Sequence, residues 1–259
     1  MRHSLISFIA LAMSATPSRS EEIATDRPDF VESSDVVGNR HLQIEMGSPF
    51  ETTEGDGVEV STFAMPVLLR YGISDSVELR LETDNFIRQT TKSAAGTTTE
   101  TGYADVALGA KWHFHDGAPG TWQPAMALLA HLDVDSGSPA FRGEGLRPSL
   151  RLVAEWELTA ATSFGLMPGV IRDKVDGERF WGGILAFTLG HQWTPRLRSF
   201  VEVAGQQLAD ERFGGNLVTY DAGFTFLVTE SLQLDVSAAF GANSNTPDRQ
   251  WGVGISQRM

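Results

Sequence analysis

Segments in which apolar and polar side chains alternate recur along this chain from His41 to its C-terminus. Residues 217–228 are the clearest case, because every second side chain is apolar and those between them are small or polar. Residues 77–84 and 149–158 repeat the pattern. A period of two is the signature of a β-strand with one apolar face. The pattern therefore predicts a chain built almost wholly from half-buried strands.

The alternating segments predict an all-β fold, a transmembrane antiparallel up-and-down β-barrel of about twelve strands formed by residues 41–259. An even number is what single-chain bacterial outer-membrane barrels have. The predicted strands are residues 41–50, 58–72, 77–88, 103–114, 122–134, 149–158, 163–172, 180–193, 197–207, 216–228, 232–241 and 249–258.

The links between these segments alternate in length, which is an independent indication of the same fold. Outer-membrane barrels join their strands by short turns on the periplasmic side and by longer loops outside. Both chain ends fall on the short-link side, so they are expected in the periplasm. The short links are residues 73–76, 115–121, 159–162, 194–196 and 229–231, and the long ones are 51–57, 89–102, 135–148, 173–179, 208–215 and 242–248.

Aromatic residues lie near the ends of the predicted strands, where a membrane barrel places its interfacial girdles. Because aromatic residues favour strands in any setting, each one taken singly is weak support. The residues are Phe50, Tyr71, Trp112, Trp122, Trp181, Trp193 and Trp251.

Composition excludes several other classes of protein. Residues 1–20 place Arg2 and His3 before a short apolar run and small residues at the end, the layout of a secretory signal peptide. After residue 20 no apolar run is long enough for a transmembrane helix. The chain has no cysteine, which excludes disulfide scaffolds and thiol catalysis. Its net charge of −13 disfavours nucleic acid as a partner.

Residues 21–40 form a polar segment ahead of the first predicted strand. Its charged residues include Asp26, Arg27 and Asp29, with Pro28 interrupting regular structure. One interpretation is a plug that folds into the lumen and brings Arg27 among lumenal carboxylates. The other is a periplasmic tail.

Ionisable residues recur on the polar faces of the predicted strands. A basic side chain facing lipid at mid-depth costs about 2 to 4 kcal/mol, so these residues are expected to face the lumen. They either line a pore that favours cations or polar solutes, or brace the lumen through pairs of arginine and carboxylate. The set is Glu78, Arg80, Glu82, Asp84, Asp105, Lys111, Arg151, Glu155, Glu202, Asp221, Asp235 and Arg258.

Histidines offer the only hints of metal binding or catalysis. His113 and His115 share a strand face beside Asp116, but no third ligand has a fixed position, so exposed histidines near a turn are the expectation. His131 and Asp133 also share a face, yet no serine accompanies them, and no nucleophile elbow or phosphate loop occurs. We expect no catalytic residues, no metal and no cofactor.

The hexapeptide Thr25-Asp26-Arg27-Pro28-Asp29-Phe30, followed by Glu32 and Ser33, is the most specific of several short segments along the chain. These segments resemble the family named for a meta-pathway of phenol degradation, a group of outer-membrane barrel proteins labelled as transporters. The resemblance implies a barrel that passes small hydrophobic or aromatic compounds. The chain departs from the pattern at Asp135-Ser136-Gly137 and ends on Met259 instead of an aromatic residue. The matching segments are residues 25–30 with Glu32 and Ser33, then 70–73, 78–81, 105–112, 200–202, 221–223 and 233–235.

The sequence thus predicts a passive outer-membrane channel for small molecules, with an acidic lumen and no enzymatic activity. The expected partners are outer-membrane lipid, small-molecule solutes and the barrel assembly machinery. The alternatives are a non-conducting structural or enzymatic outer-membrane barrel and a soluble secreted β-sandwich.

Overall fold

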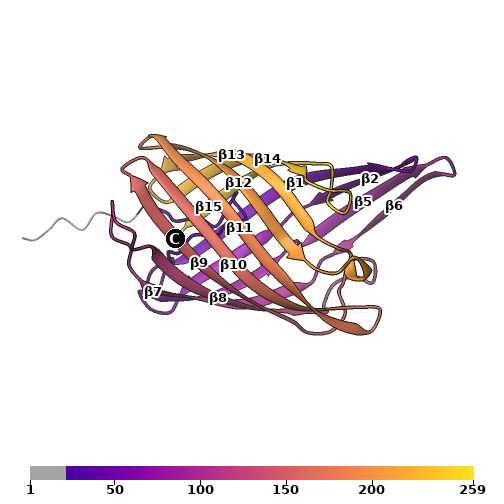
Figure 1. Ribbon diagram of the computed structural model, residues 1–259, viewed down its shortest axis with the longest axis horizontal. Helices are drawn as coiled ribbons and strands as arrows, with labels where there is room; N and C mark the ends of the chain where they lie inside the picture. The colour runs from indigo at the N-terminus through magenta and orange to yellow at the C-terminus, as the bar shows by residue number, and fades with distance from the viewer. Residues whose placement is uncertain (1–21) are drawn as a thin grey trace, which may run out of the picture.

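The computed structural model describes residues 22–259 and consists almost wholly of antiparallel strands (Figure 1). The predicted signal peptide lies outside the described residues. The strands are β1 (Leu42–Gly55), β2 (Val58–Ala64), β3 (Val67–Gly72), β4 (Val77–Thr83), β5 (Phe86–Ser93), β6 (Gly96–Tyr103), β7 (Val106–His115), β8 (Ala125–Val134), β9 (Arg147–Thr159), β10 (Thr162–Val175), β11 (Glu178–Thr194), β12 (Leu197–Leu208), β13 (Leu217–Thr229), β14 (Leu232–Gly241) and β15 (Arg249–Arg258), with one short 3-10 helix at Glu211–Phe213.

These segments build a barrel of twelve strands, as predicted, because three wall strands are interrupted midway. Pro66, which has no N–H to donate, separates β2 from β3. Asn85, with a φ of 52°, lies between β4 and β5. Asp105 lies between β6 and β7. The predicted strands 58–72 and 77–88 are therefore each broken once.

The barrel closes between its first and last strands. β1 pairs antiparallel with β15 from Gln43 opposite Arg258 to Thr52 opposite Arg249. β3, β4 and β7 to β15 pair in chain order. Closure leaves no free edge along this wall, which a strand structure in lipid requires.

The outer links are shorter than the sequence suggested, because strands occupy much of them. β1 continues to Gly55, and β10 and β11 continue to Val175 and Glu178. Asp56-Gly57 and Asp176-Gly177 form the resulting hairpin turns, with positive φ at both residues of each. Asp-Gly is favoured in such turns because the left-handed conformation costs these residues little.

The predicted loop 89–102 is a β-hairpin made by β5 and β6. This hairpin pairs with β2, and together with the ends of β1 and β2 it forms a sheet that protrudes beyond the barrel (Figure 1). Nearly all of β6 is exposed, and among the described residues β6 pairs only with β5. The prediction failed here because residues 89–102 are almost all polar or small, so they form no apolar face to detect.

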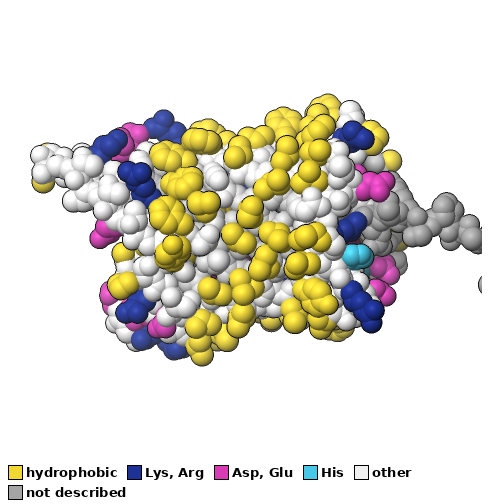
Figure 2. All heavy atoms as spheres, turned by 180° about the vertical axis from the view of Figure 1, so that it is seen from behind, with side chains coloured by type: hydrophobic (Ala, Val, Ile, Leu, Met, Phe, Trp, Pro, Cys, Tyr) yellow, Lys and Arg dark blue, Asp and Glu magenta, His cyan; other side chains and the backbone are white. Residues whose placement is uncertain are grey.

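The outer surface of the barrel is apolar between two charged ends (Figure 2). The outward side chains of each strand make this band, for example Tyr220, Phe224 and Phe226 of β13. Six of the seven aromatic residues expected in girdles, all but Phe50, are large exposed side chains. Trp122 lies before β8 instead of within it. An apolar band of this kind matches the hydrocarbon layer of a membrane.

No helix in the described part of the chain is long and apolar enough to cross a membrane.

Candidate functional site: a lumen occupied by the N-terminal segment

The wall of the lumen has a polar side and an apolar side. The polar side is formed by β1, β3, β4 and β7, and the apolar side by β8 to β12. Buried residues on the polar side include Gln43, Glu45, Arg70, Glu78, Arg80 and Lys111. The apolar side contains a buried apolar cluster of Ala127, Leu129, Val153, Met167, Ala186 and Ala204, with His131, Ser149, Thr188 and Glu202 as buried polar residues on the same strands.

Residues 22–41, here called the N-terminal segment, run into this lumen from the short-turn end and return to it. The Ile23 amide donates to the Glu230 carbonyl, at 2.9 Å, in the turn between β13 and β14. The Arg40 amide donates to the carbonyl of Gly72, at 2.8 Å, where β3 ends. Between these points the segment contacts strands around the barrel, and the structure thus places residues 22–41 inside the lumen.

Carboxylates of the wall accept hydrogen bonds from the backbone of the N-terminal segment. Glu45 accepts from the amides of Asp26 and Arg27, at 3.0 and 3.1 Å. Glu202 accepts from the amides of Phe30 and Val31, at 2.7 and 2.8 Å. Such charge-assisted bonds are stronger than bonds between neutral groups. The Ser34 and Val37 amides likewise donate to Glu155 and Glu78, at 2.6 and 2.9 Å.

The carboxylate of Asp26 lies among three cations of the polar side. Lys111 Nζ donates to both of its oxygens, at 2.8 and 2.9 Å. Arg80 Nη1 lies 2.5 Å and Arg70 Nη1 3.3 Å from Oδ2. Burial alone would raise the pKa of Asp26, but Arg70, Lys111 and Arg80 hold it far below its ordinary value. Asp26 is therefore ionised.

Glu32 makes a second set of ion pairs at the border between the two sides. Its carboxylate lies 2.7 Å from Arg80 Nη2 and 2.7 Å from Arg151 Nη1. Burial opposes ionisation, yet Arg80, helped by Arg151 and Lys111, lowers the pKa of Glu32 from its ordinary value. Asp26 and Glu32 pair with the cations Arg70, Arg80, Lys111 and Arg151, and two of these cations, Arg70 and Arg80, also pair with the wall carboxylates Glu45 and Glu78. We call these eight residues the central ion-pair network.

Arg27 lies in a groove that two glycines create. Gly47 of β1 and Gly254 of β15 are opposite each other, and a Cβ on either would meet the Arg27 guanidinium. Arg27 Nη2 donates to Asp235, at 3.2 Å. Asp29 is held by Arg198, at 2.7 Å. The three residues predicted for a plug thus all contact the barrel wall, Asp26 among them.

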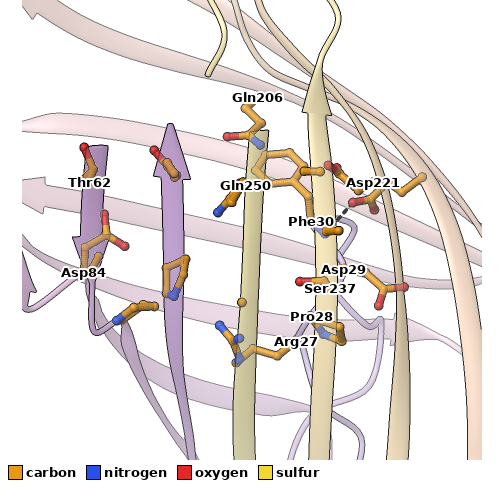
Figure 3. Close-up of a pocket in the computed structure, with 18 of the residues that line it drawn as sticks. Arg27, Pro28, Asp29, Phe30, Thr62, Asp84, Gln206, Asp221, Ser237 and Gln250 are labelled. Atoms are coloured by element: carbon orange, nitrogen blue, oxygen red, sulfur yellow. Dashed lines mark hydrogen bonds between the residues drawn. The ribbon is translucent and has the colours of Figure 1, made fainter. Parts of the chain in front are cut away.

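Between the N-terminal segment and the long-loop end of the barrel, the lumen contains cavities. A cavity of about 400 Å³ opens there, and Arg27, Pro28, Asp29 and Phe30 form its floor against the wall (Figure 3). Carboxylates line it, including Asp84 and Asp221 (Figure 3). A second cavity of about 240 Å³ lies beside Glu82, Asp133 and Arg151. Solute entering from the long-loop end therefore meets an acidic space above the segment.

The sequence-predicted lumenal residues differ in what they contact. Glu78, Arg80, Lys111 and Arg151 belong to the central ion-pair network, and Glu155 and Glu202 contact the segment's backbone. Asp235 pairs with Arg27. Glu82, Asp84 and Asp221 line the two outer cavities. Asp105, which lies between β6 and β7, pairs with Arg147 at 2.7 Å. Arg258 lies opposite Gln43 in the β1–β15 register.

Sequence reasoning missed several members of the site. Glu45 alternates with Ile44 and Met46, so the same period-two argument could have placed it in the lumen. Arg70 lies between Leu69 and Tyr71 and carried the same signal. Glu32 could not have been found in this way, because its segment forms no strand.

The histidines considered in the sequence analysis all form hydrogen bonds with neighbouring groups. His113 bonds the Ser34 carbonyl through Nδ1 and Asp116 through Nε2, both at 2.9 Å. His115 Nδ1 bonds the Pro124 carbonyl, at 2.9 Å. His131 Nε2 accepts from Arg80 Nε, at 3.2 Å. Across residues 22–259 no group of three or more candidate ligands is arranged for a metal ion.

Comparison with known families gives a match that spans nearly the whole described chain. Residues 25–259 match the family described as "Putative MetA-pathway of phenol degradation". The chain belongs to this family. No curated protein sequence matches it.

Solved structures similar to this family member are outer-membrane barrels. An outer membrane channel from Pseudomonas putida F1 is 12% identical with a TM-score of 0.60, over 88% of this chain and 98% of that one. The KdgM porin is 12% identical with a TM-score of 0.53, over 83% and 98%. The β domain of the Bordetella autotransporter BrkA is 13% identical with a TM-score of 0.53, over 85% and 99%. At such identities the similarity establishes the fold, a closed outer-membrane type of barrel.

Proposed function

We propose that this chain is an outer-membrane channel for small molecules whose N-terminal segment closes the lumen at rest. The observation that carries the proposal is the central ion-pair network, which joins the segment to the polar side of the wall. Val31 packs against the apolar side at the same time. The segment thus seals the lumen between its two sides.

Opening requires movement of the N-terminal segment and not of the barrel wall. The wall is held by continuous strand pairing, including the closing pair of β1 and β15. The segment forms no strand and is held by side chains alone through most of its length. Side-chain contacts of this kind break one by one, whereas a strand ladder opens cooperatively.

The lumenal charges set the selectivity of the open channel in this proposal. Carboxylates around the outer cavities offer partners to polar solutes on the way in, and Arg80, Lys111 and Arg151 add cations to the same lumen wall. The family name and the channel and porin among the similar structures favour passage of small solutes over catalysis. The chain is inserted by the barrel assembly machinery of the outer membrane and acts without a cofactor.

Conductance in planar lipid bilayers tests the proposal. The mature chain should show rare, small steps, and a variant that begins at His41 should show frequent, larger ones. Heat-modifiable migration on a gel verifies that both are folded barrels. A folded variant with no conductance, or equal conductance of the two chains, would overturn the proposal.

A further inference from the structure

Glu32 occupies a place where the cationic and apolar parts of the lumen wall meet. Lys111, Leu129 and Arg151 lie side by side across β7, β8 and β9. Glu32 lies 2.7 Å from Arg151 and 3.9 Å from Lys111, with Arg80 completing the group. A carboxylate bound here therefore has an apolar wall as its immediate neighbour.

Val31, next to Glu32 in sequence, fills the apolar part of the same place. It is buried against a cluster that includes Leu129, Val153 and Met167. Phe30 packs on the same cluster and lies under the Arg151 guanidinium, 5.8 Å from it. One carboxylate with an apolar group beside it thus occupies the site.

Two of the three cations of this site form their ion pairs with the N-terminal segment, whereas Arg80 also pairs with Glu78 of the wall. Within the described residues, Lys111 forms ion pairs with Asp26 and Glu32, and Arg151 with Glu32. All three pairs are lost when the segment moves. An open lumen therefore presents two cations that have lost their carboxylate partners, which favours binding of a replacement carboxylate.

Two further donors at this place have no partner even in the closed state. His131 Nε2 accepts a hydrogen bond from Arg80, so its proton lies on Nδ1, and Nδ1 is buried without a hydrogen-bond partner. Nε of Arg151 is also buried and unpaired. Both residues line the cavity of about 240 Å³ on the outer side. Room and unpaired donors therefore lie beside the Glu32 carboxylate.

We infer that this site binds small organic monoacids, whose carboxylate takes the place of Glu32 between Arg80 and Arg151 and whose apolar body takes the place of Val31. The inference rests on the proposed function and names its substrate class. Glu82, Asp84 and Asp133 line the outer cavity and repel a second negative charge, so monoacids bind better than diacids. The acid is either a free metabolite or the acidic residue of a short peptide.

Calorimetry on the full mature chain in detergent tests the inference. The probes are benzoate, its uncharged analogue benzamide and its cationic analogue benzylamine, with N-acetyl-Val-Glu-amide as the peptide arm. Benzoate should bind at least about tenfold more tightly than benzamide, because only benzoate pairs with the two guanidiniums. Equal affinities, or stronger binding of benzylamine, would overturn the inference. If the peptide binds more tightly than benzoate, the ligand is the acidic residue of a short peptide and not a free acid.

Two variants should change benzoate affinity in opposite directions. Glu32→Gln removes the internal competitor while Arg80 and Arg151 remain, so affinity should rise about tenfold. Arg151→Gln removes one guanidinium, so affinity should fall by a similar factor. Arg249→Gln is the matched control, because Arg249 is exposed and pairs with Glu54 away from the lumen. A gain in affinity cannot come from misfolding, so unchanged affinity in the Glu32 variant contradicts the inference.

Binding and conductance separate this inference from the proposed function. Calorimetry in detergent requires no current, so benzoate binding without conductance contradicts only the channel. Conductance with equal affinity for benzoate and benzamide contradicts only the substrate class.

Discussion

Asp26 is the residue through which most of the polar wall contacts the N-terminal segment. Three cations from β3, β4 and β7 converge on its carboxylate, and all four side chains are buried. A buried ion pair adds little net stability compared with an apolar pair, but removal of one partner leaves the other charges uncompensated. Removal of one partner therefore destabilises the closed state.

Replacement of Asp26 by asparagine should therefore release the segment. Loss of the carboxylate costs the closed state about 3 to 5 kcal/mol, as is usual for one partner of a buried pair. Frequent opening in bilayers and faster proteolysis of residues 22–41 should follow. Asp35→Asn is the control, since Asp35 belongs to the same segment but is exposed. Closed-state behaviour of Asp26→Asn would show that the network does not hold the segment.

Acid should open the channel only at low pH. The pKa values of Asp26 and Glu32 in the closed state lie below their ordinary values of 3.8 and 4.5. Their stabilisation of the closed state is full above these ordinary values and is lost as pH falls through the lowered ones. The contribution of Asp26 and Glu32 to closure should thus be constant from about pH 8 to about pH 5 and be lost only in stronger acid. A rise of open probability centred near neutral pH would assign control to other groups that hold the segment, such as Glu45, Glu155 and Glu202 of the wall.

Glycines in β1 and β15 show how a wall element makes room for the segment. Gly47 and Gly254 are paired, and the Arg27 guanidinium fills the space that their missing side chains leave. The groove lies on the closing pair of strands. Closure of the barrel and seating of Arg27 therefore use the same residues.

A side chain at Gly47 should expel Arg27 from this groove. Gly47→Val overpacks the site by about 1 to 3 kcal/mol, which the segment can avoid by leaving the wall. Open probability should rise and the barrel should remain heat-modifiable. Gly55→Val, at a position of the same strand with open space around it, should change neither property. The same opening in both variants would argue against a specific groove.

The elements with an apolar face were predictable from sequence, and those without one were not. Outward residues such as Tyr220 and Phe224 mark β13 because lipid requires them. The β5–β6 hairpin is polar and largely exposed, so its sequence carries no apolar period of two. The turn Asp176-Gly177 carried a strong local hairpin signal, although it was predicted as part of a longer loop.

The site was predictable only in part, for a physical reason. Alternation places Arg80 and Lys111 in the lumen, because strands fix which side a residue faces. It does not determine which carboxylate each cation meets. Asp26 and Glu32 belong to a segment without regular structure, whose path is set by long-range contacts to several strands.

The molecule as a whole combines an apolar exterior with a charged interior, the reverse of a soluble protein. The band of exposed apolar side chains needs lipid to cover it (Figure 2). The lumen, by contrast, holds fully buried arginine, lysine and glutamate. This inversion belongs to a barrel that spans a membrane.

The mature chain should accordingly fractionate with outer membranes. Its gel migration should change on boiling, because the closed sheet resists detergent until heated. Trp181 and Trp251, exposed on the wall, should be quenched by brominated lipid. A chain recovered as a soluble periplasmic protein without a heat-dependent shift would contradict the membrane barrel.

The N-terminal segment continues directly into β1, and this covalent tether has a quantitative consequence. A tethered occupant competes for the lumen at an effective concentration on the order of millimolar, however dilute the protein is. A free acid must approach that concentration before it displaces Glu32. The tether therefore shifts the concentration at which the channel opens upward, so the channel should stay mostly shut in a dilute medium and open gradually as solute becomes plentiful.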